Sequence, residues 1–148
     1  MGVEESRKGQ KGGAKQVNWE EFGETIANNV LEEIEYFCAY TSGMGDALTC
    51  YYAHSDLPLY DLAREFVGSP HNSITKRDLY LLRKMPENIY EKYDKYVRKE
   101  IERITNKLIE DYRQFYRLTC EERCGDDEEC IEDCIEGSIK EHLYGSGP

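Results

Sequence analysis

Apolar residues recur every three to four positions along much of the chain, which is the spacing of a buried helix face. Over residues 19–40 this pattern follows Asn18, with Glu21 in the position of a capping-box acid, so a helix is expected to begin there. The predicted inner face consists of Trp19, Phe22, Ile26, Val30, Ile34 and Phe37. The predicted outer face carries Glu20, Glu24, Glu32, Glu33 and Glu35.

The strongest pattern begins after Pro86, a residue that suits the start of a helix. The chain has no Gly or Pro from there to residue 118, which predicts one helix at about 87–118, roughly 50 Å long at 1.5 Å per residue. Its predicted apolar face is formed by Ile89, Tyr93, Tyr96 or Val97, Ile101, Ile104, Leu108, Tyr112, Phe115 and Leu118. Because so long a helix needs packing partners along its length, we expect helix 19–40 to lie antiparallel to it.

Shorter patterns predict three further helices. One is expected over 59–67, a second follows Thr75 with Asp78 in the capping-box position, and the last covers 128–143. The sequence ALTCYYAH at 47–54 fits a helix or a strand equally well. No β-hairpin signal is present, so the expected fold is all-α, a helical bundle organised around the helix at about 87–118.

The chain is expected to form one domain with a short tail. Residues 1–16 contain four glycines, an excess of basic residues and no periodic apolar positions, which predicts a flexible basic N-terminal tail. Residues 17–148 are then a single helical domain that includes a C-terminal hairpin over 119–143. No apolar run approaches the roughly 20 residues that span a bilayer, and no apolar core follows the basic N-terminus. We therefore expect a cytoplasmic protein without a membrane partner.

Four of the six cysteines lie within fifteen residues, in the sequence CEERCGDDEECIEDC. Two cysteines four residues apart lie on the same face of a helix. Cys120 and Cys124 would therefore line the end of the long helix, and Cys130 and Cys134 the start of the last one. When the chain folds back at 125–127, Cys124 meets Cys130 and Cys120 meets Cys134. Two nested disulfides are the favoured interpretation.

This twin CxxxC pattern resembles the disulfide-stapled helical hairpins of small plant defence peptides and of small mitochondrial import chaperones. The resemblance covers some fifteen residues and the loop here is shorter, so it implies the same connectivity and no function. The main alternative is a zinc site made by the same four cysteines, although zinc sites favour two-residue spacing. The surrounding acids oppose thiolate formation, yet they also attract a cation. Free thiols are a third alternative, and no other cofactor is expected.

The remaining residues with ligand or catalytic chemistry are scattered. Cys38 and Cys50 flank a predicted turn at 41–46 and are either a third disulfide or buried thiols. Cys50 lies four residues before His54, but one such pair falls short of a metal site. Exposed or boundary positions are expected for the three histidines, His54, His71 and His142. The turn lacks the strand and lysine of a phosphate-binding loop, and no enzyme signature is present, so we expect a non-enzymatic protein.

The net charge of −11 is unevenly distributed. Residues 17–75 sum to −9 and residues 119–148 to −8, whereas residues 76–118 sum to +4. Acidic surfaces complement the basic grooves that hold nucleic acid in polymerases and nucleases. We therefore expect an inhibitor or modulator that occupies such a channel in a host machine such as RNA polymerase or a nuclease. The expected contact surface is formed by Glu121, Glu122, Asp126, Asp127, Glu128, Glu129, Glu132 and Asp133.

Two other functions remain open. Residues 73–99 contain a capped short helix, a break at Pro86 and a basic, tyrosine-rich helix, which superficially resembles a helix-turn-helix. Nucleic-acid binding through 76–99 is disfavoured because phosphates repel a chain with a net charge of −11. The tyrosine-rich face of 90–116 favours, as a further alternative, a structural or oligomeric helical protein.

The composition also bears on the source of the chain. Abundant Glu, Lys and Arg with only three Gln are typical of thermophile proteins, and intracellular proteins of hyperthermophiles can retain disulfides. Six Asn and six Cys weigh against a thermophile. Small acidic proteins of this kind are often encoded by viruses or plasmids, which is the context we expect.

Overall fold

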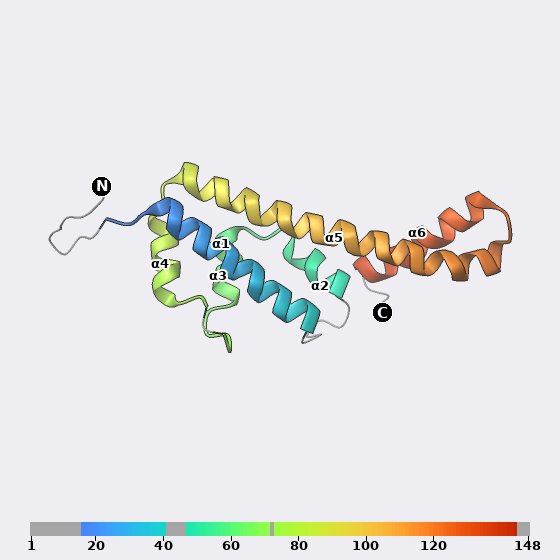
Figure 1. Ribbon diagram of the computed structural model, residues 1–148, viewed down its shortest axis with the longest axis horizontal. Coiled ribbons are helices and arrows are strands. Elements are labelled where there is room, and N and C mark those ends of the chain that lie inside the picture. The colour runs from blue at the N-terminus through green and yellow to red at the C-terminus, as the bar shows by residue number, and fades with distance from the viewer. Residues whose placement is uncertain (1–15, 41–46, 72, 145–148) are drawn as a thin grey trace.

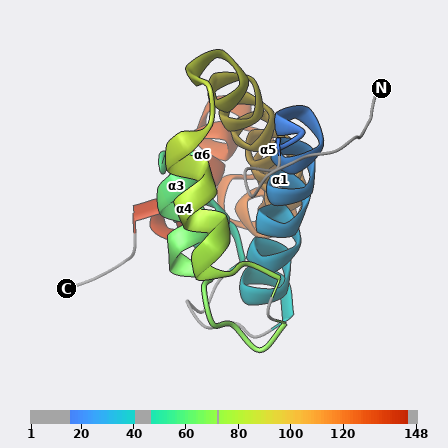
Figure 2. The same cartoon turned by 90° about the vertical axis from the view of Figure 1, so that its left-hand side faces the viewer.

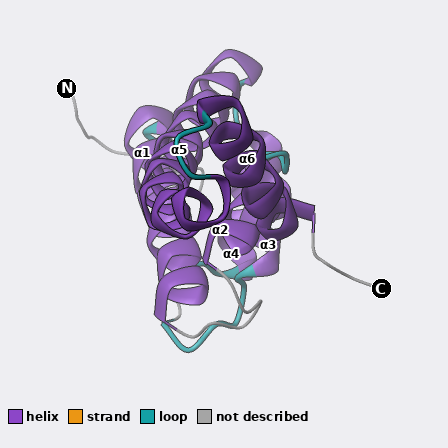
Figure 3. Cartoon of the chain, turned by 90° about the vertical axis from the view of Figure 1, so that its right-hand side faces the viewer, coloured by secondary structure: helices purple, strands orange, loops and turns teal. Residues whose placement is uncertain are grey.

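The computed structural model describes residues 16–40, 47–71 and 73–144, and within these ranges every regular element is a helix (Figures 1 and 3). The predicted tail, apart from residue 16, and the predicted turn at 41–46 lie outside them. The elements in order are α1 (Trp19–Glu35), the π-helix η1 (Tyr36–Tyr40), α2 (Ala47–His54), α3 (Leu59–Glu65), α4 (Lys76–Lys84), α5 (Glu87–Cys124) and α6 (Glu128–Tyr144). The all-α fold organised around one long helix is confirmed, and the undecided segment 47–54 is helical.

The predicted capping residues begin two of the helices. The side chain of Asn18 accepts a hydrogen bond from the backbone N–H of Glu21 at 3.1 Å. Thr75 and Asp78 form a reciprocal capping box at the start of α4. These contacts satisfy backbone donors that a helix leaves unpaired at its first turn.

Helix α5 is longer than predicted. It continues past residue 118 to Cys124 and is followed by Gly125, whose φ of 70° suits a residue without a Cβ. Its 38 residues correspond to about 57 Å. The hairpin therefore contains the last turns of α5 itself, and Cys120 and Cys124 belong to the same helix as the bundle core.

Helices α1 and α5 run in the same direction, so the expected antiparallel pairing is wrong (Figure 1). Glu20, near the start of α1, accepts hydrogen bonds from Lys92 and Tyr93, and Asn28, further along α1, accepts one from Tyr96. The chain returns through α2, α3 and α4 to the N-terminal end of α1 before α5 begins (Figures 1 and 2). A return path of that length permits parallel neighbours, whereas a short loop would have forced antiparallel ones.

The main core lies between α1, the short helices and the first half of α5. At the ambiguous position in α5, Val97 is buried and Tyr96 is 42% exposed, so Val97 faces the core. The fully buried residues of this cluster include Ile26, Val30, Ile34, Leu59, Leu62, Ile74, Val97 and Ile101. These are mostly the apolar positions that the helical spacing selects.

A second cluster joins the far half of α5 to α6 and α2. It is built from Leu48, Cys120, Ile131, Ile135 and Ile139. The predicted inward positions Phe115 and Leu118 are instead 67% and 71% exposed. The reason is that α6 packs on the face centred on Cys120, and Leu118, two residues away, points to the opposite side of α5.

Candidate interaction surface: the stapled acidic hairpin

Two disulfides join α5 to α6 in the predicted ladder. Cys120 pairs with Cys134 and Cys124 pairs with Cys130, with Cα atoms 5.8 Å and 5.7 Å apart. Cys120 is buried in the hairpin core, whereas Cys124 and Cys130 are half-buried nearer the turn. Because each sulfur is bonded to another sulfur, these cysteines offer no thiolates of the kind a four-cysteine zinc site requires.

Two arginines of α5 form a ladder of ion pairs with α6. Arg113 lies 2.5 Å from a carboxylate oxygen of Glu132, and Arg117 lies 2.9 Å from one of Glu128 and 3.0 Å from one of Glu121. The charge of Glu128, followed by the hydrogen bond from Arg117 to Glu121, raises the pKa of Arg117. Three of the eight predicted contact acids, Glu121, Glu128 and Glu132, are therefore partly neutralised within the molecule.

A fourth predicted acid has a local structural role. Asp127 accepts a hydrogen bond from the backbone N–H of Cys130 at 3.2 Å, as an N-cap of α6 does. The other four acids, Glu122, Asp126, Glu129 and Asp133, are exposed and form no ion pair with any described residue. We call these four carboxylates the free acids of the hairpin. Arg123, which lies between Glu122 and Asp126 in the sequence, is also exposed and forms no ion pair with a described residue.

The basic segment 76–99 is divided between α4 and the first turns of α5, joined only by Met85 and Pro86. Several of its cations are already engaged: Arg83 donates to the hydroxyl of Tyr60, Lys92 pairs with Glu20, and Arg98 pairs with Asp94. The other exposed cations of this segment, which form no ion pair with a described residue, are Lys76, Arg77, Lys84, Lys95 and Lys99. In the second helix of this segment, Tyr93 packs against Gly23 of α1, and Val97 is buried in the same core cluster.

A third disulfide links Cys38 of η1 to Cys50 of α2, one of the two outcomes that the sequence left open. His54 lies beside it and is only 4% exposed, so the expected exposed or boundary position is wrong. Its ring nitrogens lie 2.7 Å from the carbonyl oxygen of Cys50 and 3.1 Å from a carboxylate oxygen of Glu65. Two cysteine thiolates and a histidine ring this close together could bind a metal ion. Here the sulfurs of Cys38 and Cys50 are instead bonded to each other.

Sequence reasoning missed a buried carboxylate. Glu33 was expected on the outer face of α1, but it is 2% exposed. It accepts hydrogen bonds from the hydroxyls of Ser69 and Ser73 and lies 3.4 Å from Nδ1 of His71. Burial acts to raise the pKa of Glu33, but the two hydroxyls and His71 together outweigh it, and the pKa is lowered.

The spacing of the buried residues in α1 indicates that Glu33 should also be buried. Glu33 lies three residues after Val30 and seven after Ile26, so it falls on the buried stripe of the helix. Both serine hydroxyls around it donate to Glu33 rather than to His71. Among the described residues this cluster therefore lacks the nucleophile–base pair of a catalytic triad, and its evident role is to fix the segment between α3 and α4 against α1.

No family model, no curated protein and no solved structure matches this chain. Among the described residues, no helix combines the length and apolar character needed to cross a membrane.

Proposed function

We propose that this chain is a non-enzymatic inhibitor or modulator that places its acidic hairpin in a basic nucleic-acid-binding channel, such as that of an RNA polymerase or a nuclease. The observation that carries the proposal is the set of four free acids, Glu122, Asp126, Glu129 and Asp133, on a hairpin fixed by two disulfides. Carboxylates without internal partners are the ones available to lysines and arginines of another protein.

The physical basis is competition with phosphate. Lysines and arginines in such channels contribute much of the affinity for nucleic acid through phosphate contacts. Carboxylates held at fixed positions can occupy the same cations, and little conformational entropy is lost on binding because the disulfides have already restricted the hairpin. Such an interaction accelerates association at low salt and weakens as salt screens the charges.

The shape of the molecule supports the same function. The hairpin extends from one end of the molecule, beyond α1, α3 and α4, as Figure 1 shows. Its tip is the turn at 125–127, which contains the free acid Asp126; Glu122 precedes the turn, and Glu129 and Asp133 follow it. A groove can therefore receive the hairpin while the bulkier bundle stays outside.

The test compares two variants with equal changes in charge. In the first, the free acids are neutralised as Glu122→Gln, Asp126→Asn, Glu129→Gln and Asp133→Asn. In the control, four exposed acids elsewhere are neutralised as Glu24→Gln, Glu32→Gln, Glu35→Gln and Glu91→Gln. Affinity capture from the host first identifies the partner enzyme, and displacement of fluorescent DNA or RNA from that enzyme is then measured over a salt series.

The wild-type chain is expected to displace the nucleic acid, with affinity that falls steeply as salt rises. The hairpin variant should bind at least about ten-fold more weakly, while the control stays within about two-fold of wild type. An equal loss of affinity in the hairpin variant and in the control would show that affinity depends on net charge and not on the positions of the free acids. Salt-insensitive binding, or capture of a partner without a nucleic-acid channel, would contradict the proposal.

A further inference from the structure

Three side chains that can bind a metal ion meet at one buried point between η1 and α2. The ligand atoms of Cys38, Cys50 and His54 all lie within 4.8 Å of one another. Ligand atoms around a tetrahedral zinc ion are about 3.3–3.8 Å apart, because Zn–S bonds are about 2.3 Å and Zn–N bonds about 2.0 Å long. The Cα atoms of the two cysteines are 5.4 Å apart, so side-chain rotation alone can bring their sulfurs to such a separation once the disulfide is reduced.

The ring of His54 is already oriented for metal binding. Its Nδ1 lies 2.7 Å from the carbonyl oxygen of Cys50, and its Nε2 lies 3.1 Å from a carboxylate oxygen of Glu65. Either nitrogen can therefore bind a metal ion while the N–H of the other donates to its present partner, an arrangement typical of metal-binding histidines. The ring of Phe66 is stacked on the imidazole at 6.0 Å, and the ring of Phe37 meets it edge to face at 6.1 Å, which fixes the imidazole plane.

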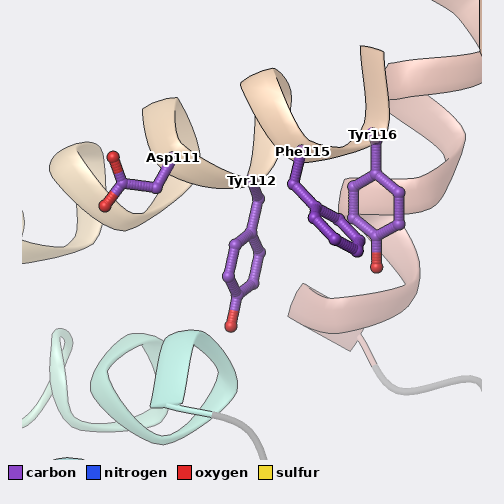
Figure 4. Close-up of a pocket in the computed structure, with 4 residues that line it drawn as sticks. All are labelled: Asp111, Tyr112, Phe115 and Tyr116. Carbon is purple, nitrogen blue, oxygen red and sulfur yellow. The ribbon is translucent and has the colours of Figure 1, made fainter. Parts of the chain in front are cut away.

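Helix α2, which carries Cys50 and His54, is held in place by α5. Its residue Leu48 is fully buried in the second apolar cluster, and Tyr112 of α5 packs against that cluster. Figure 4 shows the ring of Tyr112 extending from α5 toward the pale blue-green ribbon of α2. Cys50 and His54 lie one turn apart on the same face of this fixed helix, so little conformational entropy is lost when both bind one ion.

The charge balance also suits a buried metal ion. Cys38, Cys50 and His54 are 2%, 0% and 4% exposed. A zinc ion bound by two thiolates and a neutral imidazole has no net charge, so its burial costs little in desolvation. Four thiolates of the hairpin would instead form a negatively charged complex among the acids of that segment.

We propose that Cys38, Cys50 and His54 form a zinc site when the two cysteines are thiolates, and that the Cys38–Cys50 disulfide is the oxidised, metal-free state of that site. Thiolate and imidazole ligands in a tetrahedral arrangement are the set that zinc prefers. The fourth position is open to a water molecule or to Glu65, whose side chain is 41% exposed. The zinc site goes beyond the proposed function, because none of these residues belongs to the hairpin.

Metal binding and disulfide formation compete for the same two sulfurs. Zinc binding releases the two thiol protons to the solvent. A disulfide oxidant such as oxidised glutathione can then convert the two thiolates into the Cys38–Cys50 bond. In that step two electrons pass to the oxidant, which leaves as two thiolates, and the zinc ion is released. Because the folded disulfide is buried, zinc enters most readily while the reduced chain folds.

The test refolds the full-length chain with all cysteines reduced by a phosphine and with cadmium-113, a zinc substitute that NMR detects. We expect a cadmium signal coupled to the β protons of Cys38 and Cys50 and to a ring proton of His54, which identifies the ligands directly. Addition of oxidised glutathione should abolish this signal. Coupling to the hairpin cysteines alone, or the absence of a cadmium signal, would overturn the proposal and leave the proposed function standing.

Two histidine variants test the contribution of the imidazole. Zinc is removed from the reduced protein by a chelator of known affinity, and the backbone amide signal of Cys50 reports how much of this site is filled. The wild-type chain should bind zinc with an apparent Kd below about 1 μM. His54→Gln should bind at least about ten-fold more weakly, whereas His71→Gln, outside the cluster, should stay within about two-fold of wild type. Equal affinities of His54→Gln and the wild-type chain would overturn the proposal.

Discussion

The ring of Tyr93 lies against the backbone of Gly23 so closely that a Cβ atom on Gly23 would lie 2.4 Å from Cδ2 of the ring. The ring is held there because the Tyr93 hydroxyl donates to Glu20 at 2.9 Å and Lys92 lies over the ring face. The absence of a side chain at Gly23 therefore determines how closely α1 and α5 can approach.

We predict that Gly23→Ala destabilises the protein by about 1–3 kcal/mol, because the added methyl group must displace the ring or separate the helices. Helix propensity alone predicts the opposite sign, since Ala is better than Gly in a helix interior by about 0.5–1 kcal/mol. Equilibrium urea unfolding measures the difference. Gly137→Ala in α6 is the control, because nothing lies within 4 Å of its added Cβ, and it should be stabilising. Stabilisation by both substitutions would contradict the close packing.

The outer disulfide should contribute more stability than the inner one. Cys120 and Cys134 are 14 residues apart, whereas Cys124 and Cys130 are 6 apart, and a bridge that closes a longer loop removes more entropy from the unfolded chain. We predict that Cys120→Ala with Cys134→Ala costs roughly 3 kcal/mol or more, and that the inner pair of alanine substitutions costs less. Thermal unfolding without reductant tests the order. A larger loss of stability from the inner pair of alanine substitutions would contradict this order.

Arg117 should affect stability and partner binding in opposite directions. Arg117→Gln removes the cation that contacts Glu121 and Glu128, so the free energy of unfolding should fall, and the loss should be smaller at high salt. The two released carboxylates should at the same time tighten binding to a basic partner. Arg123→Gln changes the net charge equally at an exposed position without an ion pair to a described residue, so stability should stay within about 0.5 kcal/mol. Equal destabilisation by Arg117→Gln and Arg123→Gln would contradict a stabilising role for the ion pairs of Arg117 with Glu121 and Glu128.

Glu33 should make the free energy of unfolding depend on pH in the acidic range. Its pKa in the folded protein is lowered from an ordinary value of 4.5, so its contribution is complete above that value and is lost as the pH falls through the lowered pKa. We predict that Glu33→Gln costs roughly 1–3 kcal/mol at neutral pH and that the difference from wild type shrinks below about pH 4. Urea unfolding at several pH values measures this. Glu32→Gln, at an exposed neighbour, should not change the profile.

Local chemistry made several features of the fold predictable. Capping at Asn18 and Thr75, the uninterrupted helix after Pro86 and the ladder of four cysteines all depend on residues close in sequence. Helical spacing also places most core residues correctly, because burial of one face is the main source of stability for such helices. The nested disulfides followed from the i, i+4 spacing and a short turn.

Features that depend on distant parts of the chain were not predictable. The parallel direction of α1 and α5 depends on the path of the intervening helices. The exposure of Phe115 depends on which face of α5 meets α6, and the pair formed by Arg113 and Glu132 joins residues 19 positions apart. The sequence therefore indicated an acidic hairpin but not which of its acids remain free.

The two apolar clusters share helices. Leu108 of α5 packs against both, and α2 contributes Leu48 to one and Cys50 to the other. Rotation of the hairpin relative to the bundle would separate these contacts, so both ends of the molecule keep one relative orientation. In solution the protein should tumble as one elongated body. Residual dipolar couplings measured at the disulfide-bonded tip and in the bundle should accordingly fit a single alignment tensor.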